Sequence, residues 1–283
     1  FIRYLGDNEL YLNGQLLQPY KVFVFNPGSS IRDHNIKPIY YSDIVTLFHE
    51  EQLESKIAFE VDNISYRFKN GTIGLRPMSF IKESGRLVGI MGASGAGKST
   101  LLNVRNGTEK PTGGEIRING INIHNRKSEI EGIIGHVSQD DLLIEELTVF
   151  ENLYYNARLC FSNYREEKII STVDRMLQNL GLFEIKDIQV GTPLNKMISG
   201  GQRKRVNIAL ELIREPAVLF LDEPTSGLSS RDSENIMDLL KELSLKGKLV
   251  FVVIPQPSSD IFKMFDELLI LDTGGYLIYD GDP

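Results

Sequence analysis

The sequence predicts an α/β fold built on a mostly parallel core sheet. Three short, continuous apolar runs carry this prediction: AVLFL at 217–221, KLVFVVI at 248–254 and ELLIL at 267–271. Runs of this length suit strands that are buried on both faces of a parallel sheet. Helix-like segments separate them, and a glycine-rich loop follows a fourth apolar strand, RLVGIM at 86–91.

The composition of the 283-residue chain suits a globular protein with a sizeable core. Apolar residues make up 41% and charged residues 24%. At about 150 residues per domain, we expect two domains, or one large domain with an appendage. The single cysteine, Cys160, excludes an intrachain disulfide and favours a reducing compartment. The net charge of -7 argues against a nucleic-acid partner, and the basic run 203–205 is interpreted as a solvated helix face.

Residues 1–55 are predicted to form a small β-rich appendage of unknown role. The segments ELYL and QLL flank Asn13-Gly14, a dipeptide typical of a hairpin turn, and the apolar segment KVFVF follows them. Ser42 is a candidate cap for a helix over 43–53. No catalytic constellation is visible in this region.

The following region contains longer strand-like segments. FEVDNISYRF at 59–68 and GLRPMSFI at 74–81 are both rich in residues that favour strands. A hairpin signal follows at 113–123, with Asn119-Gly120 at its turn. Together these segments predict an antiparallel β subdomain.

A helix-rich stretch is predicted over about residues 146–213. Thr148 and Glu151 fit the T-x-x-E capping box at its start. The longest apolar runs of the chain have about six residues, whereas a membrane helix needs roughly 20. No signal peptide is visible, and because the chain opens on Phe1 we expect it to be a piece of a longer protein.

Residues 92–99 read GASGAGKS and match the phosphate-binding pattern G-x-x-x-x-G-K-[ST]. The fixed positions are Gly92, Gly97, Lys98 and Ser99. Glycines let backbone N–H groups curl around phosphate oxygens, and the helix beyond presents its positive end to the same anion. Lysine supplies a cation for the β- and γ-phosphates, and serine offers a hydroxyl to Mg²⁺. A glycine-rich turn that binds nothing is the alternative, but strand, loop, lysine and helix occur here in the required order.

Two acids end the apolar strand at 217–221. Asp222 lies where a buried strand emerges and is suited to ordering Mg²⁺, while Glu223 is suited to polarising an attacking water. Alone, Asp-Glu-Pro after a strand is usually a solvated turn. A phosphate-binding loop in the same chain reverses that preference, because both features would lie at the carboxyl ends of sheet strands.

Residues 198–202 read ISGGQ and precede a helix-like segment. Ser199, Gly200 and Gly201 are expected to start this helix with exposed N–H groups, which would make a second anion site. A capped helix start without a ligand is the alternative. A simple kinase or GTPase would have no use for the second site.

Taken together, these motifs resemble the nucleotide-binding cassette of ATP-binding-cassette (ABC) transporters. GASGAGKS resembles the Walker A motif, LFLDEP resembles Walker B, and ISGGQ resembles the LSGGQ signature with Ile198 in place of leucine. Gln139 matches the glutamine of the Q-loop. The resemblance covers 56–283 and implies a P-loop ATPase cassette with a parallel core sheet, an antiparallel β subdomain and a helical signature subdomain.

Several longer segments resemble the G (White) subfamily in particular. They are QDDLLIEELTVFENL, SGGQRKRVNIALELI, EPTSGL and QPSSDIFKMFDELLIL. Members of this subfamily carry the cassette ahead of a membrane domain in one polypeptide. The resemblance implies a fragment, itself soluble, of a half-transporter whose cassette lies at the cytoplasmic face of a membrane.

The resemblance also implies a mechanism and a set of site residues. Two cassettes pair head to tail as a homodimer, with ATP between the loop of one and the signature of the other. The catalytic residues are Glu223 and Gln139, and those implied for Mg²⁺ are Ser99, Gln139 and Asp222. The residues implied for ATP are Gly92, Ser94, Gly95, Ala96, Gly97, Lys98, Ser99, Thr100, Ser199, Gly200, Gly201 and Gln202.

An aromatic residue upstream of the loop would stack on adenine. Phe68 fits this position best and Tyr66 second. Alternation along a strand places both on one face, so a pair packed in a core is an equally good interpretation.

Two positions depart from the family pattern. The family has a histidine before Gln-Pro at the end of the strand that follows Walker B, whereas this chain has Pro255, and no histidine follows His136. The family has aspartate after Ser-Gly-Leu, whereas this chain has Ser229. Gln256 is a weak substitute for the histidine. We therefore keep a second hypothesis, a nucleotide-gated regulatory cassette with little ATPase activity.

A soluble ABC ATPase of DNA repair or translation is a third interpretation. Repair types insert a long coiled coil between Gln139 and the signature, but only 58 residues separate Gln139 from Ile198 here. Translation types carry two cassettes, and this chain has one. The sequence therefore favours the transporter.

Overall fold

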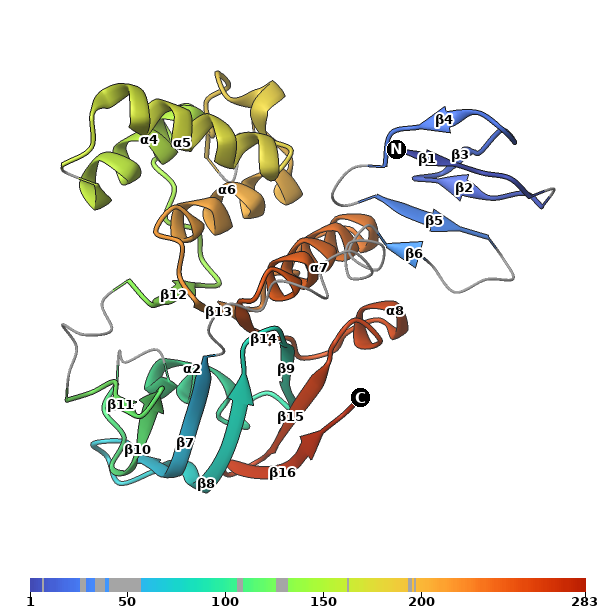
Figure 1. Cartoon of the computed structure of the whole chain (residues 1–283). Coiled ribbons are helices and arrows are strands. Elements are labelled where there is room, and N and C mark those ends of the chain that lie inside the picture. Colours follow the sequence, from blue (N-terminus) through green and yellow to red (C-terminus); the bar gives the residue numbers. More distant parts are fainter. Residues whose placement is uncertain are drawn as a thin grey trace.

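The computed structural model describes residues 1–6, 8–25, 29–33, 39–40, 57–105, 109–125, 132–161, 163–192, 195 and 197–283; the helix expected over 43–53 lies outside them. Short N-terminal strands are followed by a β-rich region and then by helices that alternate with strands (Figure 1). The architecture is α/β, as the apolar runs predict.

The core sheet has six strands in the order β12-β13-β14-β9-β15-β16. Neighbouring strands are parallel except at the edge, where β16 runs antiparallel to β15. The three apolar runs form β13, β14 and β15, which confirms the parallel core. The strands are β9 (Leu87–Gly92), β12 (Ile134–Val137), β13 (Val218–Asp222), β14 (Leu249–Val253), β15 (Glu267–Asp272) and β16 (Tyr276–Gly281).

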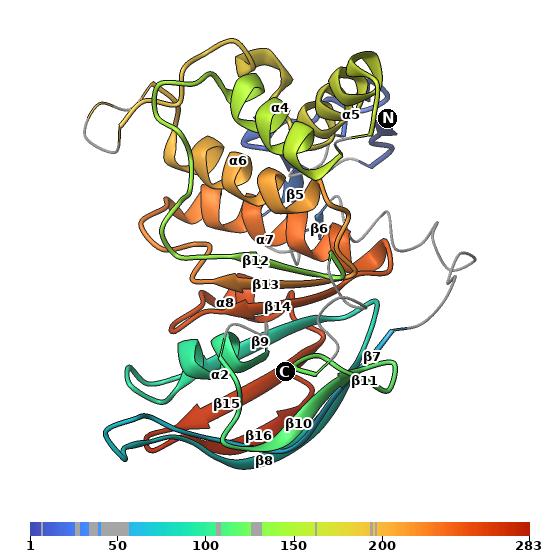
Figure 2. The ribbon, with the colours of Figure 1, turned by 90° about the vertical axis from the view of Figure 1, so that its left-hand side faces the viewer.

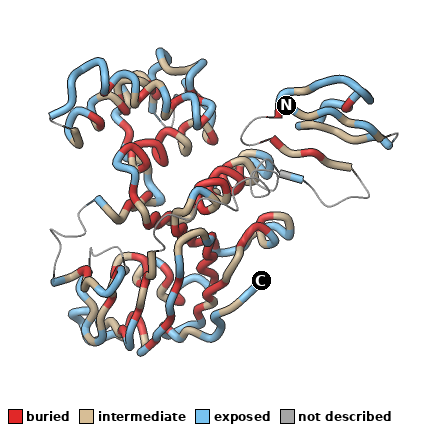
Figure 3. The backbone as a smooth tube through the Cα atoms, in the orientation of Figure 1, coloured by how far each residue is buried: buried red, intermediate tan, exposed pale blue. Residues whose placement is uncertain are grey.

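Side chains of the central strands alternate between two hydrophobic clusters, one on each face of the core sheet. In β13, Leu219 and Leu221 join one cluster, whereas Val218 and Phe220 join the other. The first face is covered by α6 (Gly200–Leu212) and α7 (Ser230–Leu245). The second face is covered by α2 (Lys98–Arg105), as Figure 2 shows. Figure 3 shows that buried positions concentrate in these strands and helices.

An antiparallel sheet in the order β11-β10-β7-β8 packs against the second face of the core sheet. Phe59 on this sheet lies edge-on to Phe220 and Phe251, with ring centroids 5.7 and 5.5 Å away. The predicted hairpin turn is confirmed, with φ of 49° at Asn119 and 79° at Gly120. The strands are β7 (Ala58–Arg67), β8 (Ile73–Glu83), β10 (Gly113–Ile118) and β11 (Ile121–Asn122).

The helical region contains α4 (Val149–Cys160), α5 (Glu166–Asn179), the short η1 (Phe183–Ile185) and α6. The predicted capping box is present at the start of α4. The Thr148 hydroxyl accepts the Glu151 N–H at 3.1 Å, and the Glu151 carboxylate accepts the Thr148 N–H at 2.8 Å. A further short helix, α8 (Ser259–Phe262), follows β14. None of the helices in the described part of the chain is long and apolar enough to cross a membrane.

The N-terminal strands have a small hydrophobic cluster of their own, formed by Leu17, Phe25 and Ile31. The predicted hairpin turn at Asn13-Gly14 is confirmed, with φ of 51° and 85°. Figure 1 shows these strands beside α7. They are β1 (Ile2–Arg3) paired with β4 (Val22–Phe23), and a sheet of β3 (Gln15–Leu16), β2 (Tyr11–Leu12), β5 (Ser30–Arg32) and β6 (Ile39–Tyr40).

Candidate functional site

The glycine-rich loop joins the end of β9 to the start of α2. Its first and last glycines adopt backbone conformations that side chains disfavour, with φ of 148° at Gly92 and 93° at Gly97. A Cβ at Gly92 would lie 2.3 Å from the Leu271 carbonyl oxygen. A Cβ at Gly97 would lie 2.7 Å from the Gly74 carbonyl oxygen. Both ends of the loop are therefore packed against backbone in a way that only glycine permits.

The Lys98 ammonium folds back across the loop. Its Nζ donates to the carbonyl oxygens of Gly92 at 2.8 Å and Ala93 at 2.9 Å. Between these ends, Gly95 has φ of 79°, and a Cβ there would have no atom within 4 Å. The loop therefore presents an open crest beside a buried cation and the N-terminus of α2. These features fit the phosphate groups of a nucleotide.

The two acids lie at the carboxyl end of β13, two strands from β9 in the sheet. Asp222 is the last residue of β13 and pairs with Val253 of β14. Glu223 follows with φ of 44°, and its N–H donates to the Val253 carbonyl oxygen at 3.0 Å. The Gln139 amide donates to the Glu223 carboxylate at 3.4 Å. The structure thus brings Gln139 and Glu223 together at the sheet end that also carries the loop.

The two departures from the family pattern occupy the same end of the fold. Pro255 and Gln256 lie just beyond β14, and both are exposed. Ser229 is the N-cap of α7, where its hydroxyl accepts the Asp232 N–H at 3.1 Å. The same hydroxyl donates to the Asp232 carboxylate at 2.8 Å. Ser229 therefore has a local structural role in capping α7.

The signature residues form the start of α6. Ser199 is its N-cap and makes a reciprocal capping box with Gln202, with hydrogen bonds of 3.1 and 2.8 Å. A Cβ at Gly201 would lie 2.7 Å from a carboxylate oxygen of Asp232, so α6 starts tightly against α7. Figure 2 shows α6 and α2 on opposite faces of the core sheet. The glycine-rich loop and the signature of one chain therefore lead into helices on opposite faces of the sheet.

Tyr66 and Phe68 lie together near the start of α2. Their ring centroids are 5.1 Å apart in an edge-to-face arrangement. A Cβ at Gly74 would meet the Phe68 ring at 2.8 Å, the Tyr66 ring at 3.1 Å and the Thr100 methyl at 3.2 Å. The Phe68 residue is 41% exposed, whereas the Tyr66 hydroxyl donates to Glu109 at 3.2 Å. Burial, followed by that hydrogen bond, raises the pKa of Tyr66.

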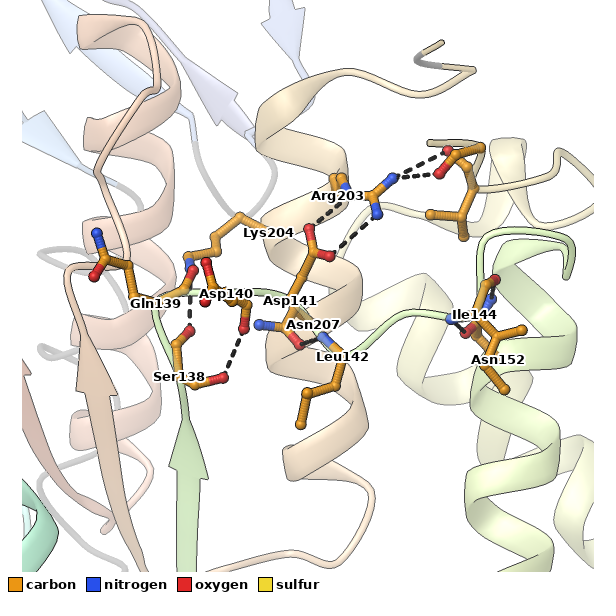
Figure 4. Close-up of polar contacts among 12 residues, drawn as sticks. Ser138, Gln139, Asp140, Asp141, Leu142, Ile144, Asn152, Arg203, Lys204 and Asn207 are labelled. Atoms are coloured by element: carbon orange, nitrogen blue, oxygen red, sulfur yellow. Dashed lines mark hydrogen bonds and ion pairs between the residues drawn. The ribbon is translucent and has the colours of Figure 1, made fainter. Parts of the chain in front are cut away.

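The interpretation of residues 203–205 as a solvated helix face is wrong. Arg203 is buried, and Lys204 and Arg205 are half-buried. Arg203 pairs with Asp141, and Lys204 donates to backbone carbonyl groups just before Asp141 (Figure 4). The sequence signal for this contact is the acidic pair Asp140-Asp141 together with the basic run 203–205. Arg203 and Asp141 are 62 positions apart in the chain, so a pattern of neighbouring residues does not show that they are in contact.

Comparison with known proteins agrees with the geometry. A family model described as ABC transporter matches residues 75–226. ABC transporter G family member 25 of Oryza sativa is 44% identical over 248 residues, covering 81% of this chain and 24% of that protein. ATP-binding cassette sub-family G member 5 of Mus musculus is 36% identical over 212 residues, covering 74% of this chain and 32% of that protein.

A solved structure is similar as well. CbiO1 of Clostridium perfringens, described as part of the ABC transporter complex CbiONQ, has a TM-score of 0.71 and 30% sequence identity. The match covers 80% of this chain and 88% of that one. The chain spans about a quarter to a third of the length of these two G-family relatives, 24% and 32%. From the matched motifs, the cassette fold and these relatives, the chain belongs to the ABC transporter family as a nucleotide-binding domain of the G (White) type.

Proposed function

We propose that this chain is the ATP-binding and ATP-hydrolysing motor of a G-type transporter. It pairs with a second cassette around ATP and drives a membrane domain of the same polypeptide at the cytoplasmic face of a membrane. The observation that supports this most is the separation of two anion-binding features. The glycine-rich loop leads into α2 and the signature starts α6, and these helices lie on opposite faces of the core sheet, which supports a phosphate site shared between two chains.

The loop residues are proposed to bind the phosphates of ATP. The open crest at Gly95 and the N–H groups at the start of α2 would surround the phosphate oxygens. Lys98 would exchange its two carbonyl partners for the β- and γ-phosphates. The remaining residues proposed for this site are Gly92, Ser94, Ala96, Gly97, Ser99 and Thr100, with Phe68 or Tyr66 stacking on adenine.

Ser99, Gln139 and Asp222 are proposed to hold Mg²⁺. Their hydroxyl, amide and carboxylate oxygens are the hard donors that this ion prefers. When bound, Mg²⁺ would neutralise charge that develops on the phosphate oxygens. Gln139 also donates to Glu223, which keeps its amide next to the proposed base.

Glu223 is proposed to accept a proton from the attacking water. Its backbone at φ of 44° turns the residue away from the strand direction, immediately beyond Asp222. The hydrogen bond from its N–H to Val253 fixes this turn against β14. A carboxylate held at a fixed place beside the phosphate site is the arrangement that general-base catalysis requires.

The signature is proposed to act on the nucleotide of the second chain. Ser199, Gly200 and Gly201 would face the γ-phosphate held by the partner's loop, with Gln202 supporting Ser199 through the capping box. The N-terminus of α6 adds partial positive charge at this place. Closure of the pair would therefore depend on ATP.

A regulatory cassette that closes on ATP but barely hydrolyses it is the second candidate function. Pro255 favours it, because proline offers neither a side-chain donor nor a backbone N–H to the γ-phosphate. Turnover by the full-length protein separates the two functions.

Lys98→Ala tests the proposed site itself. Removing a buried charge partner of the phosphates is expected to cost about 2–5 kcal/mol and to raise the Kd for ATP at least about 30-fold. Equilibrium binding of labelled ATP to the full-length protein measures this, with the exposed Lys110→Ala as the matched control. An unchanged Kd for ATP in Lys98→Ala would contradict the proposal that Lys98 and the glycine-rich loop bind the phosphates.

A further inference from the structure

The first two turns of α6 hold the segment that carries Gln139. Arg203 makes two bonds to the Asp141 carboxylate, Nε–Oδ2 at 2.5 Å and Nη2–Oδ1 at 3.1 Å. Its third nitrogen, Nη1, donates to the Gly191 carbonyl oxygen at 2.6 Å. The side chains of Arg203 and Asp141 are 8% and 26% exposed, so this pair is largely removed from water. A two-pronged contact of this kind fixes direction as well as distance.

Lys204 and Asn207 hold the backbone of the same segment (Figure 4). Lys204 Nζ donates to the carbonyl oxygens of Gln139 at 3.0 Å and Ser138 at 3.4 Å. The Asn207 side-chain oxygen accepts the Leu142 N–H at 3.4 Å. Burial lowers the pKa of the Lys204 ammonium, as expected for a cation that has exchanged water for carbonyl partners.

The far end of the segment is held by α4. The Asn152 side-chain oxygen accepts the Ile144 N–H at 2.8 Å, and its amide nitrogen donates to the Ile144 carbonyl oxygen at 3.0 Å. The segment 138–144 is thus attached to two helices through its main chain. Contacts with backbone groups determine the path of a segment whatever side chains it carries.

Gln139 itself links two parts of the molecule. Its carbonyl group is held by Lys204 of α6, and its side chain reaches Glu223 at the end of β13. Lys204 lies five positions beyond Ser199, so it belongs to the helix whose N-terminus is the signature. A displacement of that helix must therefore displace Gln139 or break these contacts.

We propose that Lys204 and Arg203 are positioning residues that tie Gln139 to the signature helix, so that the two move as one unit. The consequence for Mg²⁺ rests on the proposed function, because that function assigns Gln139 to the ion. The mechanical link stands on the contacts alone. A merely structural role would make these residues matter for the stability of the whole domain, without a selective effect on 138–144.

Hydrogen exchange in the nucleotide-free full-length protein tests the link. Lys204→Met removes the ammonium and keeps most of the side-chain length. We expect the amides of Leu142 and Ile144 to exchange about tenfold faster, as for the loss of one charge-assisted hydrogen bond. Amides in the middle of α6 should change less than about twofold. Lys204→Arg should restore protection, and Lys246→Met, at the exposed C-cap of α7, should leave the segment unchanged.

A second variant provides an independent test in case Lys204→Met does not fold. Asp141→Asn keeps the shape of the side chain, removes the charge that faces Arg203, and should loosen the same amides. If both variants leave exchange over 138–144 unchanged, the proposal is overturned. Faster exchange spread evenly over the whole cassette would also overturn it, because that result indicates general destabilisation.

Metal titration then tests the consequence. In Lys204→Met, the Mg²⁺ concentration that half-saturates its effect on ATP binding should rise about fivefold, while ATP affinity without Mg²⁺ stays unchanged. An unchanged Mg²⁺ dependence alongside loosened amides would overturn the assignment of Lys204 as a positioning residue for Gln139. If the unmodified protein shows no Mg²⁺-dependent ATP binding, the proposed function fails, and the exchange result still decides the link by itself.

Discussion

Single residues at the ends of strands carry the chemistry that we propose for this cassette. Glu223 adopts φ of 44°, a conformation that costs a non-glycine residue of the order of 1–3 kcal/mol. The neighbouring hydrogen bonds, from its N–H to Val253 and from Gln139 to its carboxylate, hold it there. Strain retained at this position fits a carboxylate that is placed for catalysis rather than for stability.

At Pro255, the missing donor leads to a prediction about rate. Loss of one donor to a developing charge typically costs ~10²–10³ in rate, and a typical enzyme turns over at about 10 s⁻¹. We expect full-length protein to hydrolyse ATP at the order of 0.01–0.1 s⁻¹. Pro255→His with Ser229→Asp should raise this rate. Aspartate is a good N-cap in general but loses the hydrogen bond from Ser229 to the Asp232 carboxylate, so the folding of the double variant is checked first.

Steady-state hydrolysis in one dimeric preparation checks this prediction. ATP affinity, measured in parallel, should be the same in all variants. A parent rate of several per second contradicts the role assigned to Pro255. So does a double variant that folds, binds ATP and keeps the parent rate.

At the scale of elements, capping side chains determine where several helices start. The helices α4, α6 and α7 each begin with a serine or threonine whose hydroxyl accepts an N–H three residues on. Thr148→Ala should therefore lower the free energy of unfolding by about 1 kcal/mol. Urea denaturation measures the change. Thr172→Ala in the middle of α5, where the hydroxyl bonds only within the helix, is the control and should be neutral. An equal loss in both variants would show that capping is not the cause.

Local patterns predicted the elements that depend on local physics. Apolar runs predicted β13, β14 and β15, because strands buried on both faces need continuous apolar residues. Hairpin turns at Asn13-Gly14 and Asn119-Gly120 followed from the backbone freedom of those dipeptides. The contact between Arg203 and Asp141 was not predictable in this way. These residues lie 62 positions apart, and only the packing of α6 beside β12 brings them together.

At the scale of the whole molecule, the core sheet separates the helices that follow the two motifs, as it separates the two hydrophobic clusters. The glycine-rich loop leads into α2 on one face, and the signature starts α6 on the other (Figure 2). The sequence predicted the motifs on each element, and the resemblance to the family implied their pairing between chains. Which face each helix covers depends on long-range packing that the motifs do not encode.

The N-terminal strands contact the cassette near the start of α7. Arg32 pairs with Glu234, whose side chain is 13% exposed, and Arg231 donates to the Asn13 carbonyl oxygen at 3.4 Å. Glu234→Gln should weaken this attachment by about 1 kcal/mol, which increases transient detachment about fivefold. Limited proteolysis should then cut within residues 1–55 faster, with ATP affinity unchanged. Glu215→Gln, which affects an exposed pair with Arg175, is the control. Equal cleavage rates in both variants would contradict a role for Glu234 in holding these strands.

The most direct test of the two-chain site is a count of trapped ATP in mixed dimers. Two differently tagged full-length chains both carry Glu223→Gln, which removes the proposed base so that bound ATP is not hydrolysed. One chain also carries Lys98→Ala, and the other also carries Ser199→Asp. Aspartate still caps α6 but places a negative charge against the partner's phosphate. If the loop of one chain works with the signature of the other, each homodimer of these variants retains no ATP. The mixed dimer then retains one ATP, from the intact loop of the Ser199→Asp chain and the intact signature of the Lys98→Ala chain. Retention of no ATP by a folded mixed dimer, while the parent dimer retains two, would contradict a site shared between chains.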